Sequence, residues 1–155
     1  MKNTNTYEAI VIGSGPAGLA CAKILADNGM NPLVIKKTRE SSSQGFHSGL
    51  IFEKSLKGIF GKFWESKPQA PFERSLTSQK SYLLDKESFT STDPEKMEGN
   101  DFIVLRTSFT NWMGKQVEKS GGNILYETLA KSLIIENEKV KGVRTEEEEY
   151  YSNIV

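Results

Sequence analysis

The chain has 155 residues, which is about the size of one domain. Its 20 Lys and Arg residues balance its 20 Asp and Glu residues, so no net field favours a nucleic acid or an anionic membrane as partner. The single cysteine excludes an internal disulfide framework and a cysteine-rich metal site. No stretch approaches the roughly 20 apolar residues of a membrane span, and no secretory leader is visible. We expect a cytoplasmic chain that would reach a membrane through partners alone.

The first 35 residues predict a strand, a helix and a second strand. Residues 7–12 form a short β-branched stretch, which is typical of a buried parallel strand. The spacing becomes helical over residues 16–28, where Pro16 suits the first turn and Gly29 suits the end. Residues 33–35 predict the next strand. This order makes a βαβ unit, whose strands are parallel.

Residues 40–100 have a different character and are predicted to form an inserted, substrate-side excursion. Apolar residues at helical spacing within 49–64 predict a short helix, which two glycines weaken. Strands are predicted at 79–84 and 88–92. The charged stretch 93–101 predicts a surface loop.

A regular pattern returns with a predicted strand at 102–105. Ser108 is predicted to cap a helix over 109–119, which two glycines end. One face of that helix is apolar, with Phe109, Trp112, Met113 and Val117. The next parallel strand is predicted at 123–127.

The last part of the chain predicts a β-meander. Strands at 131–136 and 139–145 flank Asn137-Glu138 as a hairpin, and a third strand covers 149–155. The whole pattern predicts an α/β fold, which is Rossmann-like, with a parallel sheet and a β-meander.

The motif Gly13-x-Gly15-x-x-Gly18 joins the first predicted strand to the first helix, which is the context of a dinucleotide-binding loop. Gly13 allows the tight turn, Gly15 leaves room for a pyrophosphate, and Gly18 lets the helix lie close to the strand. Pro16 and Ala17 complete the loop at the helix N-terminus, whose free N–H groups attract a diphosphate. The alternative is a glycine-rich turn that binds nothing.

The residue after the second strand departs from this pattern. A carboxylate there usually binds the ribose hydroxyls, but the chain has Lys36, Lys37 and Arg39, and Glu40 comes four residues late. Three interpretations stay open. Lys36 or Glu40 contacts the ribose of FAD or NAD; the cations form a pocket for the 2′-phosphate of NADP; or the site has decayed in a structural subunit.

Five stretches along the chain carry a family resemblance. They are YEAIVIGSGPAGLACAKILADNGMNPLVI (7–35), GFHSGLIF (45–52), FERSLTSQKSYLL (72–84), FIVLRTSFTNWMGKQVEKSGGNIL (102–125) and SLIIENEKVKGVRT (132–145). They resemble the N-terminal FAD-binding part of FixC-type dehydrogenases and electron-transfer-flavoprotein:quinone oxidoreductases, and the start also resembles geranylgeranyl reductase-like proteins and flavoprotein monooxygenases. The resemblance implies that residues 1–155 form a Rossmann-like FAD/NAD(P)-binding domain that is incomplete at its C-terminus.

This resemblance implies the FAD-binding portion of a flavin-dependent oxidoreductase that passes electrons between a flavoprotein partner and a carrier such as quinone. It implies that Gly13, Gly15 and Gly18 bind the FAD pyrophosphate and that Arg106 lies against an FAD phosphate or ribose. The alternative for Arg106 is a surface salt bridge. It also implies that Ser48 and Gly49 lie near the flavin.

The departures from the family define the competing functions. Lys36 replaces the ribose acid, and the chain stops before a second FAD motif that the family carries. The rest of the FAD site would then come from a second polypeptide or a missing C-terminal half, with electron-transfer flavoprotein as a candidate partner. The alternatives are a non-catalytic structural subunit with a degenerate site, or an NADP-binding domain.

Two further residues have reactive side chains. Cys21 lies on the first predicted helix and is expected to pack in the core. His47 is a candidate acid–base group without a visible partner. No Ser/His/Asp set and no metal-ligand spacing is found, so catalytic residues stay unassigned.

Overall fold

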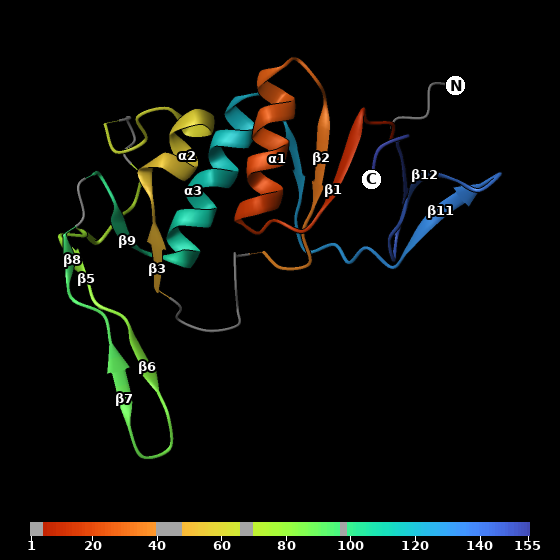
Figure 1. Cartoon of the computed structure of the whole chain (residues 1–155). Helices are drawn as coiled ribbons and strands as arrows, with labels where there is room; N and C mark the ends of the chain where they lie inside the picture. Colours follow the sequence, from red (N-terminus) through yellow and green to blue (C-terminus); the bar gives the residue numbers. More distant parts are fainter. Residues whose placement is uncertain (1–4, 40–47, 66–69, 97–98) are drawn as a thin grey trace. The chain divides into compact units, whose positions relative to one another are not determined.

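The computed structural model describes residues 5–39, 48–65, 70–96 and 99–155. The chain divides into two compact units (Figure 1). The first contains residues 1–46 and 106–155, and the second contains residues 47–105. Both ends of the chain therefore belong to the unit that carries the predicted phosphate loop.

The first unit is built on a parallel sheet with the strand order β1-β2-β10. Strand β1 (Ala9–Ile12) leads into helix α1 (Pro16–Asp27) and then into β2 (Pro32–Ile35), which confirms the predicted βαβ unit. Strand β10 (Asn123–Leu125) pairs with the other side of β2. Helix α3 (Arg106–Lys119) packs against α1.

Helix α3 begins before the predicted cap. The Thr110 hydroxyl donates to the Arg106 carbonyl at 2.6 Å, a bond that spans one helical turn, so Arg106 already lies within the helix. Ser108 is exposed in the first turn, and its prediction as the cap is wrong. The predicted apolar face is confirmed, because Phe109, Trp112, Met113 and Val117 are all buried.

Cys21 is exposed, which corrects its predicted place in the core. The buried positions of α1 are Leu19, Ala22 and Ala26, which recur at helical spacing and face the sheet and α3. Cys21 lies two residues from Leu19, about 200° around the helix, and therefore points to solvent.

An antiparallel meander completes the first unit. It consists of β11 (Ser132–Glu136), β12 (Lys139–Arg144) and β13 (Glu149–Tyr151). β13 is shorter than predicted. The residues after it run beside β1 instead, where the Ile10 N–H donates to the Ile154 carbonyl at 2.9 Å.

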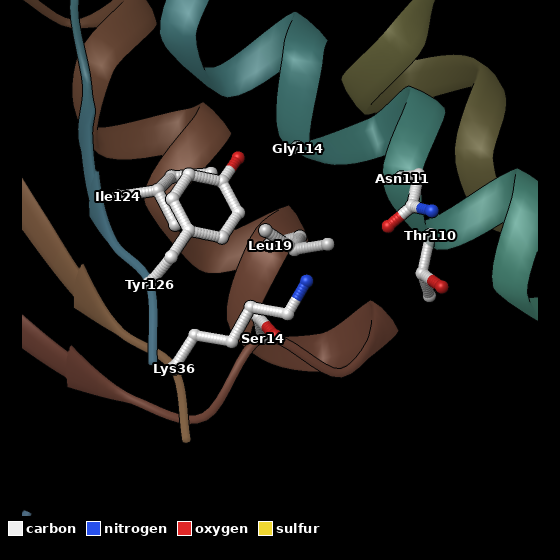
Figure 2. Close-up of a pocket in the computed structure, with 8 residues that line it drawn as sticks. All are labelled: Ser14, Leu19, Lys36, Thr110, Asn111, Gly114, Ile124 and Tyr126. Carbon is white, nitrogen blue, oxygen red and sulfur yellow. The ribbon is translucent and has the colours of Figure 1, made fainter. Parts of the chain in front are cut away.

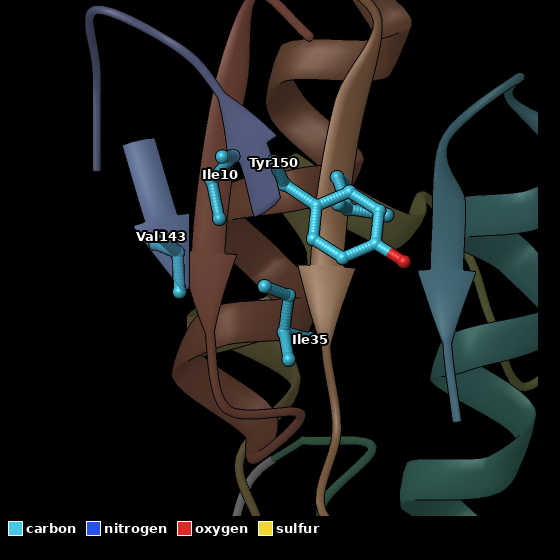
Figure 3. Close-up of a cluster of buried hydrophobic side chains, with 5 residues drawn as sticks. Ile10, Ile35, Val143 and Tyr150 are labelled. Atoms are coloured by element: carbon cyan, nitrogen blue, oxygen red, sulfur yellow. The ribbon is translucent and has the colours of Figure 1, made fainter. Parts of the chain in front are cut away.

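One hydrophobic cluster joins the meander to the parallel sheet (Figure 3). Its buried members are Ile10, Leu33, Ile35, Val143 and Tyr150. Tyr150 follows four consecutive glutamates, Glu146 to Glu149. Its ring is covered because alternate residues of β13 face the sheet.

The second unit has its own antiparallel sheet, β3-β9-β4. Strand β3 (Ser48–Ile51) is followed by helix α2 (Glu53–Phe60). Strand β9 (Phe102–Leu105) has the predicted bounds and pairs with β3 and with β4 (Arg74–Ser75). Phe63, Phe72 and Phe102 are among the aromatic residues that pack beside this sheet.

A hairpin extends from the second unit (Figure 1). Its two short ladders pair β5 (Ser78–Gln79) with β8 (Glu95–Lys96) and β6 (Tyr82–Leu84) with β7 (Phe89–Ser91). The predicted strand 79–84 is thus interrupted, and the predicted loop 93–101 contains a strand. Within the described residues, no helix combines the length and apolar character that crossing a membrane requires.

Candidate functional site

The turn between β1 and α1 requires two of its three glycines for steric reasons. Gly13 has φ 104°, a conformation that side chains disfavour, and its N–H donates to the Ile35 carbonyl at 2.9 Å. A Cβ on Gly18 would overlap the Gly13 carbonyl oxygen. These two glycines therefore let α1 start directly against the turn.

Gly15 has a different role, because the fold itself does not require a glycine there. Its backbone is extended, with φ −69° and ψ 172°, and a Cβ would meet nothing within 4 Å. Gly15 is the N-cap of α1, yet no side chain caps the helix and no acidic residue lies in its first turn. With Pro16 at the first helical position and Ala17 exposed behind it, the helix N-terminus faces open space, which suits a diphosphate.

Lys36 lies at the carboxyl end of β2, and the residue is 5% exposed. Its ammonium is 5.1 Å from the centre of the Tyr126 ring and donates to the Arg39 carbonyl at 3.4 Å. The Lys36 backbone is held by two hydrogen bonds as well. Its N–H donates to the Leu125 carbonyl at 2.9 Å, and its carbonyl accepts from the Thr128 N–H at 2.9 Å. The side chain is therefore part of the packed structure rather than a solvated strand end.

A small cavity of about 10 Å³ lies beside Lys36 (Figure 2). It is lined by Ser14, Leu19, Lys36, Thr110, Asn111, Gly114, Ile124 and Tyr126. Such a volume holds a single water molecule at most. The cavity is therefore far too small to hold a dinucleotide.

Tyr126 was not among the residues predicted for the site. Its hydroxyl donates to Glu118 at 3.1 Å, and burial together with this carboxylate raises the pKa of the Tyr126 hydroxyl. Tyr126 directly follows β10, at the sheet edge where ligands of parallel α/β sheets bind. Because ligands bind at the carboxyl ends of parallel strands, the strand predicted at 123–127 could have pointed to Tyr126 as a site residue.

A family model described as "FAD binding domain" matches residues 6–150. The chain belongs to the FAD-binding domain family. This FAD-binding domain is similar to the FixC protein of Rhizobium meliloti, with 30% identity over 146 residues, 90% of the chain and 33% of the relative. It is 29% identical over 154 residues to YdiS of Escherichia coli K12, a probable electron transfer flavoprotein-quinone oxidoreductase, covering 96% of the chain and 35% of the relative.

Solved structures confirm the fold of the domain. A geranylgeranyl bacteriochlorophyll reductase-like protein from Thermoplasma acidophilum matches with a TM-score of 0.73 and 20% identity, over 97% of the chain and 38% of that structure. The flavin-dependent brominase Bmp2 matches with a TM-score of 0.72 and 20% identity, over 95% of the chain and 36% of that structure. The predicted Rossmann-like fold, the FAD assignment and the resemblance to FixC-type proteins are thus confirmed. The domain spans about a third of the length of its curated relatives.

The remaining predicted site residues fall in different places. Lys37 and Arg106 are exposed in the first unit, Arg106 at the start of α3. Among the described residues, the ion pairs that the structure shows do not include Arg106. Ser48 and Gly49 belong to β3 of the second unit.

Two residues weighed in the sequence, Glu40 and His47, lie outside the described residues. At the end of β2, the described residues 36–39 are Lys, Lys, Thr and Arg, so they offer no acidic acceptor for ribose hydroxyls. The two parts of the site thus differ. The open, uncapped start of α1 at the glycine loop suits a diphosphate such as that of FAD, whereas the end of β2 lacks the carboxylate of the usual ribose site.

Proposed function

We propose that this FAD-binding domain holds the adenosine diphosphate part of FAD in an electron-transfer dehydrogenase of the FixC kind. The carrying observation is the open space at Gly15, because the fold tolerates a side chain there and the loop nevertheless has none. The N–H groups at the start of α1 would bind the diphosphate. The exposed guanidinium of Arg106 would add a positive charge. FAD, when bound, supplies the two-electron chemistry.

The rest of the flavin site would come from further polypeptide. The matched relatives are about three times as long as this chain, so most of their length has no counterpart here. The name of YdiS refers to an electron transfer flavoprotein and to quinone. We propose an electron transfer flavoprotein as the electron donor and a quinone as the electron acceptor. The additional polypeptide would complete the site at which they react.

A second candidate function is a structural subunit that keeps the fold but has lost the cofactor. Lys36 favours the structural subunit. Where a carboxylate usually binds the ribose, the chain has a buried ammonium that contacts the Tyr126 ring and the Arg39 carbonyl. The two candidates differ in one measurable property, the affinity of the chain for FAD.

Calorimetric titration of FAD and of ADP into the chain tests the proposal. We expect both to bind, and Gly15→Asp to weaken both at least tenfold while the melting temperature is kept. Aspartate is a good N-cap and preserves α1, but its carboxylate would occupy the place of the diphosphate. Gly58→Asp is the matched control, because Gly58 also has open space and lies in helix α2 of the second unit. Absence of binding by the unmodified chain would favour the structural subunit.

A further inference from the structure

The end of β2 has a lysine at the position where dinucleotide sites of this fold use a carboxylate. That carboxylate accepts a hydrogen bond from the ribose 2′-hydroxyl, so it must be open to the nucleotide. Lys36 is only 5% exposed and offers almost no surface to a ligand. The side chain at this position is therefore reversed in charge and also withdrawn from solvent.

The buried ammonium is the first member of a chain of contacts within the first unit. It lies 5.1 Å from the centre of the Tyr126 ring, and the Tyr126 hydroxyl donates to Glu118 at 3.1 Å. Lys36 follows β2, Tyr126 follows β10, and Glu118 lies on α3. A cation is attracted to an aromatic face most strongly where water is excluded. These contacts therefore hold β2, β10 and α3 together at the carboxyl edge of the sheet.

The Lys36 side chain is directed inward. Figure 2 shows it pointing into the small cavity that it lines together with Ser14, Leu19 and Asn111. Its ammonium also donates to the Arg39 carbonyl at 3.4 Å. A ligand could reach this ammonium only if the side chain left these surroundings.

We propose that Lys36 is a structural residue in the place of the usual ribose ligand, and that the site binds nucleoside diphosphates without distinguishing the substituent at the ribose 2′ position. The described residues 36–39 include no carboxylate that could accept from a 2′-hydroxyl or repel a 2′-phosphate. Lys37 and Arg39 are exposed, so water and salt screen their attraction to a phosphate. Recognition then depends on the diphosphate at the start of α1, and in this respect the inference rests on the proposed function.

A double-mutant cycle tests the structural role of Lys36. Lys36→Met and Tyr126→Leu each remove one partner of the contact, and urea denaturation of the full chain gives the unfolding equilibrium constant of each variant. We expect the two substitutions to be coupled by at least about threefold in this constant, the size of a cation–π contact. Tyr126→Phe keeps the ring, so Lys36→Met should have the same effect in that background as in the unmodified chain. Lys37→Met is the matched control, because Lys37 is exposed and should show no coupling with Tyr126→Leu.

Calorimetric titrations test the specificity of the site. The unmodified chain should bind ADP and 2′-deoxy-ADP with affinities within about twofold, and ADP-ribose and 2′-phospho-ADP-ribose within about threefold, since no hydrogen bond to the 2′ position is made or lost. Lys36→Glu places a carboxylate at the end of β2 and should favour ADP over 2′-deoxy-ADP by about tenfold, the effect of one charge-assisted hydrogen bond. Lys36→Met adds no acceptor and should show the same two ratios as the unmodified chain.

Other results would overturn the proposal. Independent effects of Lys36→Met and Tyr126→Leu would show that their contact does not stabilise the fold. A preference of about tenfold for ADP over 2′-deoxy-ADP by the unmodified chain would mean that another group binds the hydroxyl, and a similar preference for the 2′-phosphate would assign that phosphate to Lys37 and Arg39. In either case ADP still binds and the proposed function stands. If none of the nucleotides binds, the proposed function and the specificity both fail, and the cycle alone decides whether Lys36 is structural.

Discussion

At the scale of single residues, Gly18 in α1 and Gly114 in α3 allow opposite predictions for the same change. Gly18→Ala should lower the free energy of unfolding by about 1–3 kcal/mol, because its Cβ would overlap the Gly13 carbonyl oxygen. Gly114→Ala should be neutral or stabilising, since its Cβ would only touch the end of the Ile124 side chain at 3.4 Å. Chemical denaturation of both variants measures the difference. Equal stabilities would show that the loop can shift away from α1.

Substitutions of Lys36 should show whether the missing ribose carboxylate limits the affinity for FAD. Lys36→Glu would restore a carboxylate at the end of β2, where ribose hydroxyls can donate to it. We expect FAD to bind about tenfold more tightly, the effect of one charge-assisted hydrogen bond. Lys36→Met, which also removes the ammonium near Tyr126 but adds no acceptor, is the control. Tighter binding by both variants would mean that the ammonium itself opposes FAD.

The sequence predicted the glycine loop well because the steric demands of a tight turn are local. Gly13 and Gly18 act on each other across five residues. The burial of Lys36 could not be predicted in the same way. It depends on Tyr126, ninety residues later, which β10 brings beside β2.

At the scale of elements, the meander is attached to the sheet through Tyr150, and its hydroxyl makes this attachment sensitive to pH. The Tyr150 hydroxyl donates to Glu148 at 3.1 Å, and burial together with that carboxylate raises its pKa from 10.0 to about 12. A group whose pKa is higher in the folded state stabilises the fold fully below its unfolded pKa. We therefore expect stability to fall as the pH rises from about 10 to about 12.

Denaturation midpoints at pH 9 and pH 11.5 measure this loss. Tyr150→Phe keeps the ring in the cluster of Ile10, Ile35 and Val143 but has no proton to lose. Its stability should therefore fall less over the same pH interval than that of the unmodified chain. An identical fall in both proteins would assign the effect to other groups, among them Tyr126 and Tyr151, whose pKa values are also raised.

The elements with a strong apolar pattern were predicted correctly in type and place, but several of their ends were not. β9 matches its predicted bounds because four apolar residues follow a charged loop. α3 extends two residues before its predicted cap, because Arg106 continues directly from β9 into the helix. The ladders of the hairpin were harder to recognise, since their strands are two or three residues long and exposed on both sides.

At the scale of the whole molecule, the phosphate loop and its supporting elements belong to one unit that the second unit interrupts in sequence. β1, α1, β2, α3 and β10 all lie in the first unit, and so do Lys36 and Arg106. The sequence predicted an excursion over 40–100, because the helical and strand patterns weaken there. The structure divides the chain at 47 and 105.

This division predicts that the first unit binds the adenosine diphosphate part of FAD by itself. In a variant that joins residues 1–46 to 106–155 through about ten Gly and Ser residues, the linker would span on the order of 17 Å. We expect a cooperative thermal transition by circular dichroism and an ADP affinity within about threefold of the full chain, because the sheet, both helices and the cluster around Ile35 are retained. The same variant with Gly15→Asp should fold but not bind. A non-cooperative transition would show that the second unit is needed for the first to fold.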